Sequence, residues 1–122
     1  MKKIFYRKLV RDKIPEVISA RDRQCECLVM DNKTFGKELL KKAVEESKGL
    51  MAANSKKELV SELADVYEVL TEIEKFNKIE RAEITKARKV NLKIKGGFKK
   101  RLFLIWSSDE KYKSNESVGK SK

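Results

Sequence analysis

The fold is decided by residues 55–76, SKKELVSELADVYEVLTEIEKF. Ser55 is followed three positions later by Glu58, a capping-box spacing that marks the start of a helix. Apolar residues then recur every three or four positions, which predicts a buried stripe on a helix that ends near Phe76. The predicted stripe contains Leu59, Leu63, Val66, Leu70 and Ile73, with Ala64, Tyr67 and Val69 beside it.

The segment before it, residues 33–53, carries the same pattern. Asp31 or Asn32 is the predicted N-cap, and Asn54 interrupts the pattern before the next helix begins. The predicted apolar stripe contains Phe35, Leu39, Leu40, Ala43, Val44 and Leu50. Two antiparallel helices joined by a tight link are therefore expected.

Two further helices are predicted on either side of this pair. Asp12 is the expected N-cap of a helix that runs to about Arg21, with Pro15 tolerated in its first turn. Another helix is expected over residues 79–94, and the glycine pair 96–97 stops it.

Residues 24–30 and 99–106 have the mixed apolar composition of short strands, which could pair with each other. The predicted fold class is therefore mainly α, a helical bundle with a short two-stranded β element. Residues 1–106 are expected to form one helical domain. Residues 107–122 are polar and basic, and we expect them to form a disordered tail.

A chain of 122 residues can build one modest core. Since 40% of its residues are apolar and 40% charged, long amphipathic helices are expected, and pairing of copies would complete the core. The longest apolar run, residues 102–106, is too short to span a bilayer. With Cys25 and Cys27 expected to be free thiols, a cytosolic protein without membrane contact is predicted.

The net charge of +11 is unevenly distributed. Residues 1–24 carry a net +5 and residues 86–101 a net +8, whereas residues 25–85 carry a net −3. Such basic flanks attract nucleic acid, and they also attract a nucleoside triphosphate if the acidic centre holds a metal ion.

The acidic centre contains a candidate metal site. Glu62 and Asp65 are three positions apart, so their carboxylates project from one face of the helix. Glu45 and Glu46 lie on the preceding helix, which is expected to run alongside. Mg²⁺ is the ion that such carboxylates suit, with Mn²⁺ as a substitute. The alternative is that these acids are solvated and pair with neighbouring lysines.

Candidate phosphate-binding groups lie in two basic segments. Residues 6–15 contain Lys8, Arg11 and Lys13 at the entry to a helix, where free backbone N–H groups attract anions. Residues 95–101 combine a glycine pair with cations, of which Lys95 and Arg101 are the candidates. The alternative is that the glycines only stop a helix.

The order of these elements resembles the MazG-like all-α nucleoside triphosphate pyrophosphohydrolases, in particular their phosphoribosyl-ATP pyrophosphohydrolase-like branch. The resemblance covers about residues 6–104. It is carried by KLVRDKIP at 8–15, by ELADV at 62–66 and by GGF at 96–98, which RLFL follows at 101–104.

The resemblance implies a helical homodimer or homotetramer that cleaves a nucleotide between its α and β phosphates, releasing pyrophosphate. By position, Glu46, Glu62 and Asp65 would be metal ligands. Glu45 would be a further ligand or would position the attacking water, so Glu45 and Glu46 are the candidate catalytic residues.

The chain departs from the family's pattern at two positions. Gly49 stands where a second Glu-x-x-Glu carboxylate is expected, and Lys95 where the branch usually has arginine. The change at Gly49 is compatible with weaker metal binding, with compensation by Glu45, or with a nucleotide-binding protein that has lost catalysis. A basic nucleic-acid-binding module is the least favoured reading, because few aromatic residues lie near the basic runs to stack on bases.

Overall fold

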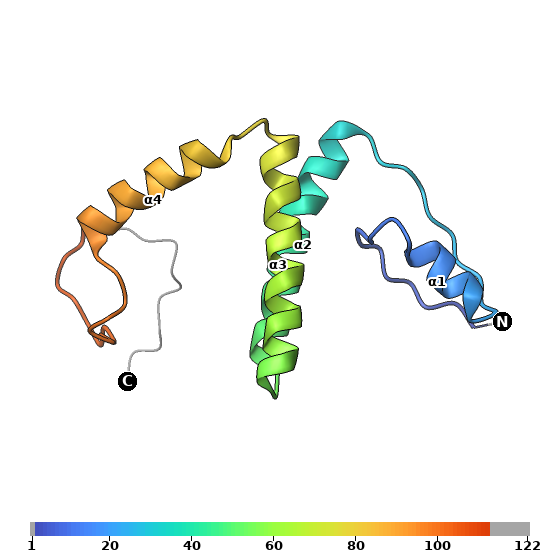
Figure 1. Cartoon of the computed structure of the whole chain (residues 1–122), viewed down its shortest axis with the longest axis horizontal. Coiled ribbons are helices and arrows are strands. Elements are labelled where there is room, and N and C mark those ends of the chain that lie inside the picture. Colours follow the sequence, from blue (N-terminus) through green and yellow to red (C-terminus); the bar gives the residue numbers. More distant parts are fainter. Residues whose placement is uncertain (1, 113–122) are drawn as a thin grey trace. The chain divides into compact units, whose positions relative to one another are not determined.

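The computed structural model describes residues 2–112 and contains four helices, which confirms the mainly α fold class (Figure 1). They are α1, Ile14–Ala20; α2, Asn32–Ala52; α3, Lys56–Phe76; and α4, Arg81–Lys95. The chain divides into two compact units, Met1–Lys86 and Ala87–Lys122. None of the helices in the described part is long and apolar enough to cross a membrane.

Side-chain caps fix the first residues of the two long helices. Oδ1 of Asp31 accepts a 2.8 Å hydrogen bond from the backbone N–H of Thr34. Oγ of Ser55 accepts one of 3.1 Å from the N–H of Glu58, whose carboxylate accepts in turn from the N–H of Asn54. Each cap satisfies N–H groups that have no partner inside the helix. The predicted starts of both helices are confirmed.

The α1 helix begins differently from the prediction. Lys13, not Asp12, occupies the N-cap, and no side chain caps the helix. Pro15 lies in the first turn, where its missing N–H costs no helical hydrogen bond and its fixed φ favours the helix. The start of α1 therefore depends on proline instead of a carboxylate cap.

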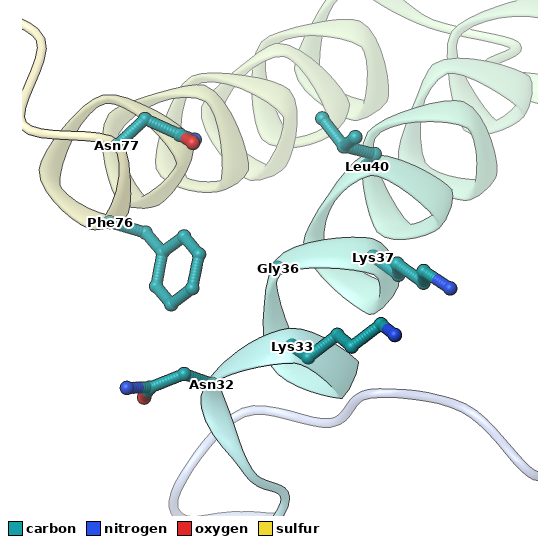
Figure 2. Close-up of a pocket in the computed structure, with 7 residues that line it drawn as sticks. All are labelled: Asn32, Lys33, Gly36, Lys37, Leu40, Phe76 and Asn77. Atoms are coloured by element: carbon teal, nitrogen blue, oxygen red, sulfur yellow. The ribbon is translucent and has the colours of Figure 1, made fainter.

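The α2 and α3 helices run antiparallel and pack side by side (Figure 1). Leu39 on α2 is buried, with 3% of its surface exposed. Phe35 and Phe76 meet edge to face with ring centroids 5.3 Å apart, a favoured aromatic geometry. Figure 2 shows the Phe76 ring facing Gly36, where a Cβ atom would lie 2.7 Å from the ring.

The predicted burial of the apolar stripes is only partly correct. Val66 and Ile73 are half-buried against α2, but Leu40, Leu63 and Leu70 are exposed by 57%, 40% and 43%. A helical hairpin gives each helix one neighbour, so a stripe wider than that contact stays open to solvent. Among residues 2–112, Leu39 is the only buried apolar residue. The hairpin therefore leaves much of its apolar surface uncovered.

A salt bridge joins the end of α3 to the start of α4. The guanidinium of Arg81 donates two hydrogen bonds, of 2.9 and 3.2 Å, to the carboxylate of Glu74. The α4 helix ends at Lys95, and the next residue, Gly96, has a φ of +78°, a conformation that glycine adopts without strain. The predicted glycine stop is confirmed.

The predicted β element is absent from residues 2–112. Residues 24–30 and 101–106 are irregular, and no described segment pairs with either to complete a ladder. Strand composition alone does not form a strand, because each backbone N–H and C=O needs a partner on a neighbouring strand. Cys25 and Cys27 lie in the first of these segments and are exposed free thiols, as predicted. Most of the predicted tail, residues 113–122, lies outside the described residues.

Candidate metal and phosphate site

Three carboxylates converge where α2 and α3 pack together. Glu46 comes from α2, and Glu62 and Asp65 come from α3. One oxygen of each lies within 4.8 Å of the others, and all three side chains are half-buried. We call these three residues the carboxylate cluster. It brings together the three metal ligands that the resemblance implied.

The N-terminal segment before α1 lies against the acidic side of the hairpin. The Lys8 ammonium donates a 2.8 Å hydrogen bond to Glu45, next in sequence to the cluster. The Arg11 guanidinium donates one of 3.1 Å to Asp65, a cluster residue. Leu9 and Val10 between them are half-buried. Two of the predicted phosphate-binding cations therefore lie beside the cluster.

Lys42 is a third cation in this region, and the sequence indicated it only as one of the neighbouring lysines that could pair with the acids. Its ammonium lies 3.2 Å from Glu45 and 3.4 Å from Glu46, and its side chain is only 11% exposed. Its spacing of three and four residues from these acids is the signal that identifies it in the sequence.

The remaining predicted phosphate-binding residues are placed apart from these contacts or in the other unit. Lys13 is exposed at the N-cap of α1 and forms no ion pair with the described residues. Lys95 and Arg101 belong to the second unit, so their part in a phosphate site stays a prediction.

Glu45 is held in its ionised form. The hydrogen bond from Lys8 is the main cause that lowers the pKa of Glu45, and Lys42 lowers that pKa further. The same hydrogen bond raises the pKa of Lys8. An ionised carboxylate can accept a hydrogen bond from a water molecule, but a lowered pKa weakens it as a general base. The hydrogen bonds from Lys8 and Lys42 and the lowered pKa therefore suit Glu45 to orienting water better than to removing its proton.

Negative charge is in excess at the site. Glu68 adds a fifth carboxylate, since Arg11 also lies 3.8 Å from it. Together with Glu45 and the cluster, five carboxylates face the three cations Lys8, Arg11 and Lys42. Two negative charges are left over, and a divalent cation would neutralise them.

Gly49 lies one turn beyond Glu46 on α2, at the position where the resemblance placed another carboxylate. The carboxylate of Glu62 lies directly over it, and a Cβ atom at position 49 would be 2.9 Å from Cδ of Glu62. Sequence reasoning identified Gly49 as a missing ligand but not its closeness to Glu62, because the register of two helices cannot be read from one sequence.

Comparisons with family models, with curated proteins and with solved structures each return no match to this chain. A functional conclusion therefore depends on the residues and geometry described above.

Proposed function

We propose that this chain is a Mg²⁺-dependent nucleotide pyrophosphohydrolase, which cleaves a nucleoside triphosphate or a related nucleotide into a monophosphate and pyrophosphate. The proposal depends chiefly on the convergence of Glu46, Glu62 and Asp65 within 4.8 Å, from two helices, beside two cations of the N-terminal segment.

The donor set suits the ion. Carboxylate oxygens are hard ligands, and Mg²⁺ commonly takes a few of them while water and substrate phosphates fill its other positions. Glu46, Glu62 and Asp65 would hold Mg²⁺, or Mn²⁺ in its place. When bound, the ion would polarise the phosphate and lower the pKa of an attacking water.

Lys8 and Arg11 are suited to bind the phosphates. Their side chains are 41% and 61% exposed, and ion pairs of this kind contribute about 0–1 kcal/mol. Their present carboxylate partners can therefore be exchanged at little cost. The Arg11 guanidinium can donate hydrogen bonds to two phosphate oxygens at once. Such charge-assisted hydrogen bonds are stronger than hydrogen bonds between neutral groups.

Glu45 would orient the attacking water. It is adjacent to the cluster residue Glu46, and Lys8 and Lys42 hold its carboxylate in the ionised state. Glu46 would contribute both as a ligand and by fixing Lys42 next to Glu45.

A second copy of the chain is the proposed cover for the apolar side of the hairpin, giving a homodimer or homotetramer. Leu40 and Val44 on α2 and Leu63, Tyr67 and Leu70 on α3 are exposed by 40–63%. Helical spacing places them on the side of the hairpin opposite Glu45 and Glu68. Burying one such side chain fully contributes about 1.5–3 kcal/mol, so covering this surface favours association.

The cytoplasm is the proposed location. Cys25 and Cys27 are exposed and unpaired, and thiols stay reduced in that compartment.

Pyrophosphate release from a panel of canonical and modified nucleoside triphosphates tests the function. Release is expected with Mg²⁺ or Mn²⁺, and a chelator should abolish it. Glu62→Gln and Asp65→Asn, which keep the side-chain shape and remove the charge, should lower the rate about a hundredfold or more, because a Lewis acid supplies several kcal/mol. Unchanged rates in both variants would contradict the assignment of the metal ligands.

A nucleotide-binding protein without turnover is the second candidate. The observations that favour it are the absence of a carboxylate at Gly49 and the lowered pKa of Glu45. Calorimetry that detects nucleotide binding, with no pyrophosphate above background, would support this candidate over the first.

A further inference from the structure

Gly49 requires an explanation, because a glycine inside a helix is unfavourable by about 1 kcal/mol relative to alanine. Position 49 lies in the last turn of α2, which ends at Ala52. Its backbone does not require glycine: among the glycines described, only Gly96 has a positive φ. The reason must therefore lie in the space around position 49.

That space is filled by Glu62. A Cβ atom on residue 49 would overlap Oε2 of Glu62, and it would lie 2.9 Å from Cδ and 3.6 Å from Cγ of the same side chain. Real Cβ atoms essentially never lie within 3.0 Å of another group, as this one would of Oε2 and Cδ, so any side chain at position 49 must move Glu62.

The displaced group is the charged end of a flexible side chain. Glu62 can swing toward solvent by rotation about its χ angles, which strains neither helix. A substitution at position 49 should therefore leave the hairpin folded while taking the Glu62 oxygen out of the cluster with Glu46 and Asp65.

We propose that Gly49 is a positioning residue: because it has no side chain, the Glu62 carboxylate can fold onto α2 and join Glu46 and Asp65 in one divalent-cation site. This inference rests on the proposed function. On this account Glu62, a ligand from α3, occupies the space that a glutamate side chain at position 49 would need. The glycine is then part of the site and not a defect in it.

The test is a titration of the full chain with Mn²⁺, in which electron paramagnetic resonance measures the free ion. Gly49→Ala should raise the Kd for Mn²⁺ by roughly 10- to 100-fold, the usual effect of losing a residue that orients a ligand. Its thermal midpoint should be equal to the parent's or higher, because alanine favours the helix. If the role of Gly49 were purely structural, Gly49→Ala would instead lower the thermal midpoint.

Gly36→Ala is the matched control. It makes the same change in the same helix and also crowds an α3 side chain, since its Cβ would lie 2.7 Å from the Phe76 ring. It lies far along α2 from the carboxylates, so its Kd for Mn²⁺ should equal the parent's. An equal loss of affinity in both glycine variants would overturn the inference.

A double-mutant cycle shows whether Gly49 acts through Glu62. Glu62→Ala should weaken Mn²⁺ binding, and adding Gly49→Ala to it should cause no further loss. Parent-like affinity in Gly49→Ala would overturn the positioning role alone. If the parent does not bind Mn²⁺ saturably, the metal site of the proposed function fails, and this inference fails with it.

Discussion

Arg11 donates a hydrogen bond of 3.1 Å from Nη1 to Oδ1 of Asp65, a residue 54 positions further along the chain. This contact joins the basic N-terminal segment to the carboxylate cluster. Under the proposed function, Asp65 has two competing uses, one as the partner of the Arg11 guanidinium and one as a metal ligand. A nucleotide with its metal would satisfy both residues, because the ion takes Asp65 and a phosphate takes Arg11.

Arg11→Gln should therefore separate the binding of nucleotide from the binding of metal. We expect the KM for the nucleotide to rise roughly 10- to 100-fold, since a hydrogen bond to a charged group contributes about 1.5–3 kcal/mol. The Kd for Mn²⁺ without nucleotide should stay the same or fall, because Asp65 loses a competing cation. Steady-state kinetics and a Mn²⁺ titration measure the two quantities.

Lys3→Gln is the control for that experiment, since it removes one positive charge from an exposed position of the same segment. It should leave both quantities near the parent's values. A weaker Mn²⁺ affinity in Arg11→Gln would contradict the exchange of partners.

Leu63→Glu should break the proposed association of copies. Leu63 is 40% exposed on the apolar side of α3, so the hairpin can tolerate a carboxylate there. The proposed interface between copies cannot tolerate that carboxylate, because an unpaired charge is costly to bury. Analytical ultracentrifugation should find a dimer or tetramer for the parent and a monomer for Leu63→Glu. Ser61→Glu is the control, because it places the same charge at another exposed position of α3, and it should sediment like the parent. A parent that sediments as a monomer at micromolar concentration would exclude the association.

Ser55→Ala should destabilise the hairpin. The variant removes the oxygen that accepts from the N–H of Glu58, and losing such a cap costs about 1 kcal/mol. The free energy of unfolding by urea should fall by that amount, whereas Ser61→Ala, within α3, should not lower it. An equal free energy of unfolding in Ser55→Ala and parent would show that the cap does not stabilise α3.

Acid should weaken the start of α2 through Asp31. The hydrogen bond from the backbone N–H of Thr34 lowers the pKa of Asp31. A carboxyl group with a lowered pKa in the folded state stabilises the fold above its unfolded pKa, about 3.9, and loses that contribution as the pH falls through its folded pKa. Asp31→Asn caps without titrating, so the stability difference between parent and variant should shrink below about pH 4. A difference that does not change with pH would contradict this assignment.

The helices could be predicted from the sequence because their signals are local. Caps at Asp31 and Ser55 and the stop at Gly96 depend on neighbouring residues alone. The exposure of Leu63 and the irregular course of residues 24–30 depend on which segments become neighbours. Apolar periodicity identifies a face of a helix but does not show what covers it.

The candidate site was predictable to a similar extent. The spacing of Glu62 and Asp65 places both on one helical face, and the resemblance aligned Glu46 with them. The pairs of Lys8 with Glu45 and of Arg11 with Asp65 cross 37 and 54 positions, so no local pattern indicates them. The packing of Glu62 over Gly49 depends on the register between two helices, which only coordinates give.

The most direct test of the proposed function is a ³¹P NMR spectrum of a nucleoside triphosphate incubated with the protein, with and without Mg²⁺. The account predicts that monophosphate and pyrophosphate form together in equimolar amounts, with signal areas of 1:2, and only when the metal is present. Release of orthophosphate and a diphosphate, or an unchanged spectrum from a folded parent protein with Mg²⁺ and each nucleotide of the panel, would contradict it.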